Sequence, residues 1–212
     1  MQRARSHWKA LAAAAATGVA LSAAAVAMPA QAQQRENEIH FPMVRSAAAT
    51  NAGCLPNAAA DVEVKSLGPV EKMRVRVKGL PAHTDFDFFV IQVPNAPFGM
   101  SWYQGDIETD GHGRGTGVFV GRFNIETFIV APDTAPAPVV HDQPNPDAAS
   151  NPPTGPVHTY HLGLWFNSPA DAAAAGCPNT VTPFNGEHNA GIQVLSTRNA
   201  ADDQGPLRQL EP

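Results

Sequence analysis

The sequence predicts an all-β protein, an antiparallel β-sandwich with an immunoglobulin-like topology preferred over a jelly roll. Three observations carry this prediction. Apolar and polar residues alternate along several short segments, which is the two-residue period of strands with one solvated face. The chain contains 17 glycines and 20 prolines in 212 residues, so turns are frequent. Helix start and stop signals surround one short segment, near residues 169–175.

The first 32 residues are typical of a secretory signal peptide. Arg3, Arg5 and Lys9 give a basic start, an apolar run follows over residues 11–28, and the small residues at 30–32 match a signal peptidase site. The apolar run is at the lower length limit for a membrane span, and no stop-transfer charges follow it. The sequence therefore predicts cleavage after residue 32, no membrane span in the mature chain, and a secreted, extracellular protein.

Residues 54–200 are expected to form the β-sandwich domain, between a flexible, alanine-rich lead-in (33–53) and a C-terminal tail (201–212). The clearest strand signal is KMRVRVK, where Met73 and every second residue after it are apolar and the residues between are basic. The same reasoning predicts further strands, and a hairpin around the glycine-rich turn at 110–113. These strands cover residues 61–67, 86–93, 102–109, 116–123, 126–131, 157–166 and 192–197.

A proline-rich segment and the short helix interrupt this series of strands. Residues 132–156 contain eight prolines, and proline cannot donate to a strand ladder, so a long surface loop is expected there. Ser168 is a suitable N-cap residue, Pro169 suits the first helical turn, and Gly176 suits a left-handed helix end. The predicted helix is therefore one or two turns long.

The charge balance excludes two classes of partner. The chain has 14 basic and 19 acidic residues, a net charge of −5, and loss of the three basic residues of the signal peptide leaves −8. Nucleic-acid binding requires a basic surface, and anionic membrane surfaces attract basic segments. The sequence therefore predicts a protein that binds neither nucleic acid nor a membrane surface.

The chain contains two cysteines, Cys54 and Cys177. An even pair without CxxC spacing in an exported chain is typical of one disulfide. In the chain-entropy model, closing a loop of more than a hundred residues contributes about 4–5 kcal/mol of stability.

Two histidines, His158 and His161, are the first candidates for metal ligands. On a regular strand, residues three apart project from opposite faces, so this pair is not expected to bind one ion locally. A long-range site remains open, in which Glu187 or His188 folds back to join one of the two histidines. Three such ligands are sufficient for a catalytic zinc. The alternative is a polar turn segment with no metal, which the sequence favours, and no cofactor is predicted.

Three aromatic residues are candidates for a ligand-facing patch: Trp102, Tyr103 and Trp165. Aromatic rings bind sugars and peptides well, but the sequence favours core packing over ligand binding for each of them. No serine lies in a GxSxG pattern, and no carboxylate pair is singled out for acid–base chemistry. The sequence therefore favours a protein without catalytic activity.

Three stretches together resemble a known group of proteins: FGMSWYQGDIETDGHGRGTG, FNIETFIVAP and TYHLGLWFNSPADAAAAGCPNTVTPFNGEHNAG. They are similar to secreted single-domain proteins of high-GC Gram-positive bacteria that have no assigned activity, over about residues 54–200. That resemblance implies export and one compact domain, and it supplies no catalytic residues. The stretch VRVKGLPAHTDFDFFVIQV is also similar to the first strands of immunoglobulin-like and fibronectin-like modules.

The sequence thus predicts a secreted, disulfide-bonded β-sandwich protein that acts as a non-catalytic binding module. Its expected partner is a cell-envelope polymer or an extracellular protein. One alternative is a secreted metal-dependent enzyme that uses the long-range histidine and glutamate site. The other is a purely structural extracellular protein.

Overall fold

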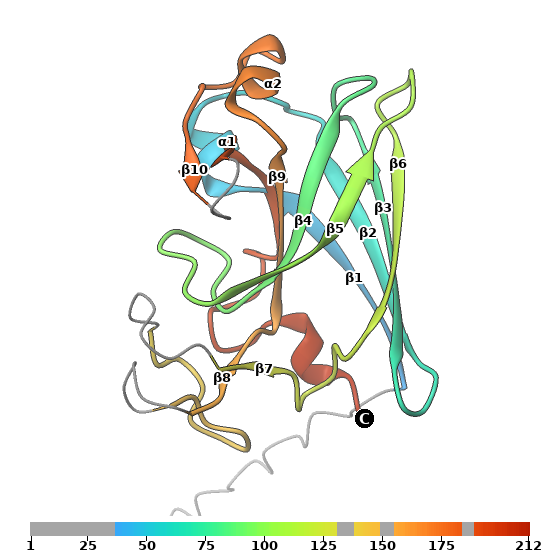
Figure 1. The fold of residues 1–212 in the computed structure, drawn as a ribbon, viewed down its shortest axis with the longest axis vertical. Coiled ribbons are helices and arrows are strands. Elements are labelled where there is room, and N and C mark those ends of the chain that lie inside the picture. The colour runs from blue at the N-terminus through green and yellow to red at the C-terminus, as the bar shows by residue number, and fades with distance from the viewer. Residues whose placement is uncertain (1–36, 131–137, 149–154, 184–188) are drawn as a thin grey trace, which may run out of the picture. The chain divides into compact units, whose positions relative to one another are not determined.

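The computed structural model describes residues 37–130, 138–148, 155–183 and 189–212, all within one compact unit (Figure 1). Strands dominate the described residues and every pairing between them is antiparallel, so the predicted all-β, antiparallel character is confirmed. The predicted signal peptide lies outside the described residues. Within the described part of the chain, no helix has the length and apolar character needed to cross a membrane.

Eight strands form one antiparallel sheet that curves until it is nearly closed into a barrel. The strand order is β5-β4-β9-β12-β1-β2-β3-β6. The strands are β1 (Glu38–Arg45), β2 (Ala59–Ser66), β3 (Glu71–Lys78), β4 (Asp85–Ile91), β5 (Ser101–Glu108), β6 (Gly115–Gly121), β9 (His161–Phe166) and β12 (Gln193–Ser196). Two ribbons of two-residue strands accompany the sheet, β7 (Phe128–Ile129) with β8 (Val157–His158) and β10 (Thr182–Pro183) with β11 (Asn189–Ala190).

The predicted β-sandwich is not confirmed, because β1 joins strands that two separate sheets would keep apart. One end of β1 pairs with β12, where Val44 lies opposite Ser196. The rest of β1 pairs with β2, from Glu38 opposite Lys65 to Met43 opposite Ala60. The eight strands therefore share one continuous hydrogen-bonded sheet.

The prediction that residues 33–53 form a flexible lead-in is wrong for the part that the structure describes. Residues 38–45 are strand β1, in the middle of the sheet, and helix α1 (Ala47–Asn51) follows. Ile39 and Met43 are buried, with Phe41 packed against the core between them, so the alternation of a strand is present there. Pro42 interrupts this pattern in the sequence, and the short run of alanines after it does not suggest an ordered helix.

The prediction of a trailing C-terminal tail is also wrong. Residues 206–209 form a short 3₁₀ helix, η1 (Pro206–Gln209), and the side chains of Leu207 and Leu210 are fully buried in the core. The Leu207 N–H donates to the Tyr160 carbonyl at 3.2 Å, and the Ile125 N–H donates to the Leu210 carbonyl at 3.0 Å. The C-terminal residues thus cover one end of the barrel interior.

The predicted short helix is confirmed as α2 (Pro169–Ala174). Ser168 is its N-cap, and its hydroxyl accepts a hydrogen bond from the Asp171 N–H at 3.1 Å. The helix ends at Ala174, and Gly176 adopts the positive φ of 75° that glycine tolerates. This short turn delivers Cys177 to the disulfide.

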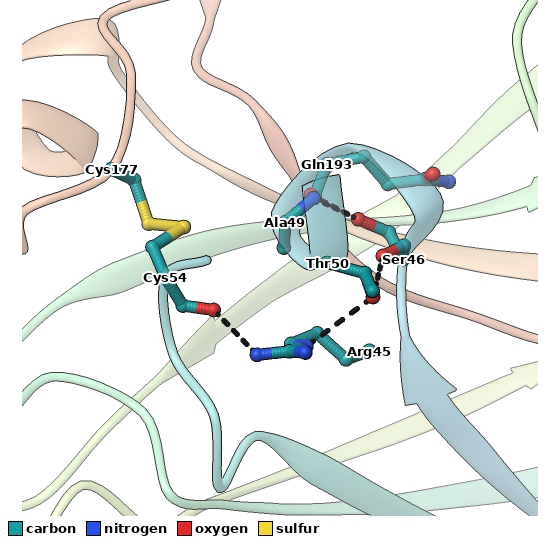
Figure 2. Close-up of a disulfide and its surroundings, with 7 residues drawn as sticks. All are labelled: Arg45, Ser46, Ala49, Thr50, Cys54, Cys177 and Gln193. Carbon is teal, nitrogen blue, oxygen red and sulfur yellow. Dashed lines mark hydrogen bonds between the residues drawn. A yellow bond between two sulfur atoms is a disulfide. The ribbon is translucent and has the colours of Figure 1, made fainter. Parts of the chain in front are cut away.

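The predicted disulfide between Cys54 and Cys177 is confirmed, with the two Cα atoms 5.4 Å apart (Figure 2). The Arg45 guanidinium donates to the Cys54 carbonyl at 3.2 Å and to the Thr50 hydroxyl at 3.3 Å. Ser46 caps α1 by accepting from the Ala49 N–H at 3.0 Å, and its hydroxyl donates to the Gln193 carbonyl at 2.6 Å. The bond therefore links α2 to a segment that is itself fixed to β1 and β12.

We expect Leu207→Ala to destabilise the protein by about 3 kcal/mol, because it leaves a cavity under the C-terminal residues. The control is Leu67→Ala, since Leu67 is half-exposed in a turn and its loss should change stability by less than about 0.5 kcal/mol. Urea unfolding of both variants measures the difference. Equal midpoints for Leu207→Ala and wild type would show that the C-terminal residues are not part of the folded core.

Candidate functional site

The sheet has one opening, the gap between its two end strands β5 and β6, which we call the seam. These strands follow one another in the chain, and no hydrogen-bonded ladder joins them although both are fully described. Figure 1 shows that they lie close together near their connecting turn and diverge toward the beginning of β5 and the end of β6. The predicted hairpin at 102–123 is therefore present as two consecutive strands, without a shared ladder.

The Phe119 side chain fills the narrow part of the seam. Its ring stacks on Phe88, with ring centroids 5.0 Å apart and an interplanar angle of 11°. A Cβ atom on Gly105 would lie 3.1 Å from this ring, and one on Gly117 would lie 2.7 Å from it. At Gly117 a side chain would overlap the ring, and Gly105 adopts a positive φ of 145° that other residues rarely adopt.

Beyond Phe119 the diverging strands leave a cavity of about 640 Å³, which we call the seam cavity. Strand β5 contributes Trp102 and Gln104, β6 contributes Val120, and residues 121–130 form much of the remaining wall. A volume of this size is typical of ligand-binding pockets in proteins. The seam cavity is therefore the candidate functional site.

The rim of the seam cavity is apolar and exposed. The exposed fractions are 60% for Trp102, 64% for Val120, 54% for Phe128 and 46% for Val130. Nine large hydrophobic side chains are exposed among the described residues, and these four line one cavity. Single exposed apolar residues are common on soluble proteins, but a contiguous group marks an interaction site.

Charged groups in the wall balance one another. The Arg122 guanidinium lies 3.8 Å from a carboxyl oxygen of Glu126 and 3.9 Å from one of Glu71. Glu71 is fully buried, and it accepts hydrogen bonds from the Phe123 N–H at 2.6 Å and the Asn124 side chain at 2.9 Å. These bonds fix residues 122–124 at the end of β6. Because Arg122 lies beside two carboxylates, the cavity wall carries no unbalanced positive charge.

A second carboxylate, that of Asp147, fixes the β7–β8 ribbon beside the cavity. It accepts hydrogen bonds from the His158 N–H at 2.7 Å, the His141 Nδ1–H at 2.9 Å and the Gln92 side chain at 3.1 Å. Burial alone would raise the pKa of Asp147, but the hydrogen bonds from His141 and His158 outweigh it and lower the pKa. The described part of the proline-rich loop, residues 138–148, is thereby attached to β4 and β8.

The two histidines of the sequence prediction make separate sets of contacts. His158 donates from Nδ1 to the Thr127 carbonyl at 2.9 Å, and its ring stacks on Tyr160. His161 shares its Nε2–H between the Ala201 and Asp202 carbonyls, both at 3.1 Å, and its Nδ1 accepts from the Thr197 hydroxyl at 2.8 Å.

The other two residues of the predicted long-range site, Glu187 and His188, lie outside the described residues. Within the described part of the chain, no group of three or more His, Cys, Asp or Glu side chains is arranged to hold a metal ion. The long-range metal site therefore stays a prediction from the sequence.

The three candidate aromatics do not form one patch. Trp102 is exposed in the wall of the seam cavity. Tyr103 is exposed on the other side of β5, where it packs against Phe89 and donates to Asp106 at 2.6 Å. Trp165 is fully buried against Phe89, so it packs in the core and does not face a ligand. The reason is that β9 is covered on both faces, which a single strand pattern does not reveal.

Sequence reasoning missed three of the four rim residues, namely Val120, Phe128 and Val130. A signal for Val120 was available in GVFVG, where three successive apolar residues require an apolar side chain on both faces of β6. Phe128 and Val130 gave no such signal, because their segment reads as an ordinary strand.

Comparison with family models, curated proteins and solved structures finds no match to this chain.

We expect His161 to make the protein sensitive to acid. Burial lowers the pKa of His161 to about 4, whereas the unfolded chain takes up the proton near pH 6.5. The contribution of neutral His161 to the free energy of unfolding is therefore fully present above pH 6.5. It decreases as the pH falls, and about 3 kcal/mol is lost at pH 4. The measurement is urea unfolding at pH 7 and pH 4 for wild type and His161→Gln.

Glutamine retains an N–H donor for the two carbonyls and does not titrate in this range. The variant should therefore lose less stability between the two pH values than wild type does. The same loss in both proteins would show that His161 does not cause the acid sensitivity.

Proposed function

We propose that this protein is an exported, non-catalytic binding module, and that its seam cavity holds part of an extracellular protein partner. The observation that carries the proposal is the apolar rim formed by Trp102, Val120, Phe128 and Val130 around one cavity. Removing such a rim from water on binding is favourable by about 25 cal/mol per Å² of apolar surface. The rim thus supplies the driving force, and the cavity supplies the shape.

The chemistry of the rim favours a protein partner over a cell-envelope polymer. Three of its four exposed side chains are valine or phenylalanine, and Trp102 is the single indole. Protein interfaces have an apolar centre in which aromatic residues are enriched, within a polar edge. The Arg122–Glu126 pair provides such an edge here.

Two features support a location outside the cell. The first 32 residues have the pattern of a signal peptide, and the Cys54–Cys177 disulfide suits an oxidising compartment. The alternative of a metal-dependent enzyme would have to use His158 rather than His161, because His158 makes its hydrogen bond to the Thr127 carbonyl through Nδ1. Both ring nitrogens of His161 are used in hydrogen bonds, so it has no lone pair free for an ion.

The test compares three immobilised proteins: wild type, Trp102→Ala and Val181→Ala. Val181 is an equally exposed apolar residue that does not line the cavity, so it is the matched control. Each protein is exposed to the soluble extracellular proteins of the source organism and, separately, to its cell-wall polysaccharide. We expect wild type and Val181→Ala to retain the same protein, and Trp102→Ala to retain it about 30-fold less tightly, because a central interface tryptophan contributes about 2 kcal/mol or more.

Two outcomes would contradict the proposal. Retention of polysaccharide that depends on Trp102 would show that the partner is an envelope polymer. Equal retention by all three proteins would show that the cavity is not the binding site and would favour a structural role.

A further inference from the structure

We infer that the partner enters the seam as an extended peptide strand that pairs with the free edge of β6. This inference rests on the proposed function and specifies how the same site recognises its partner. Strands β5 and β6 are the two ends of the sheet, so each has one edge that forms no ladder with any residue that the structure describes. Unpaired N–H and C=O groups along an edge are a template for one more strand.

Strand β6 is the better template of the two. It pairs with β3 in unbroken register over seven residues, from Gly115 opposite Val77 to Gly121 opposite Glu71. Strand β5 has a register shift beside Gly105, where the ladder with β4 is interrupted. Such bulges protect an edge from further pairing, because the strand bends away and leaves a residue unpaired.

The free edge of β6 lacks the devices that block strand addition. The Val118 and Val120 side chains of β6 are exposed, and residues 115–121 contain no lysine, proline or charged residue. The neighbouring strand β3, which pairs with β6, carries basic side chains on the same outer face. The exposed valines are therefore not part of a general apolar surface. An apolar, regular and uncharged edge is otherwise a predicted aggregation site, which makes a dedicated occupant the better explanation.

The seam cavity determines which side chains the added strand needs. Side chains of a strand alternate between two faces, so a peptide on β6 directs every second side chain into the seam cavity toward Trp102. The Arg122 charge is already balanced by Glu126 and Glu71, so these positions call for no acidic residue. The expected occupant is an extended segment with neutral, apolar side chains at alternate positions.

The test uses a peptide selected on the purified protein from a library of random linear peptides, then synthesised with one backbone N-methyl group at each position in turn. N-methylation removes one N–H donor and leaves every side chain unchanged. Affinity should fall about tenfold at every second position and stay unchanged at the positions between, because only alternate N–H groups face the edge of β6. Hydrogen exchange at the edge-facing amides of Val118–Gly121 should slow on binding.

The outcomes separate this inference from the proposed function. A selected peptide whose binding requires Trp102 but tolerates every N-methyl group, with no added protection in β6, would overturn the strand inference and leave the binding module intact. Selected peptides that bind Trp102→Ala as well as wild type would count against both. Failure to select any peptide, while a protein partner is retained through Trp102, would show that the partner does not bind as a linear strand. The side-chain control is Val181→Ala, which should not change the N-methyl pattern.

Discussion

The hydrogen bonds that β1 makes on both of its edges join the two halves of the sheet, and the seam depends on them. Because β1 pairs with β12 at one end and with β2 along the rest, eight strands share one curved surface. Curvature in one direction brings the outer edges of β5 and β6 toward each other, as Figure 1 shows. With two separate sheets in their place, these strands would not become the last two edges of a barrel.

The seam remains open because side chains prevent the last ladder from forming. Phe119 occupies the interior at the narrow part, and beside Gly105 the ladder of β5 with β4 has a register shift. Full closure is the usual way in which a β protein removes its edges. Here closure is incomplete, and apolar side chains surround the remaining opening. We interpret this combination as a binding feature, because an unprotected apolar edge has a cost in solubility.

Buried carboxylates hold the segments that complete the cavity wall. Glu71 fixes residues 122–124, and Asp147 fixes the described part of the proline-rich loop to β8. Burying a carboxylate is costly unless hydrogen bonds satisfy its oxygens, and each of these accepts at least two. Phe123 and Ile125, in the segment after β6, are also buried in the hydrophobic core. Polar bonds and apolar packing therefore hold the wall of the site together.

The sequence by itself determined the strand content, the capped helix before Cys177 and the disulfide, because these depend on local periodicity, capping residues and the number of cysteines. The expectation that His158 and His161 do not share a local site assumed one strand over residues 157–166, whereas the structure places the two histidines on different strands, β8 and β9. The structure alone decided that residues 38–45 form the joining strand, that Leu207 belongs to the core, and that Trp102 is exposed while Trp165 is buried. Those outcomes depend on which strands become neighbours. Pairing between distant segments leaves no periodic signal in either one, so a barrel with an open seam cannot be derived from the chain one segment at a time.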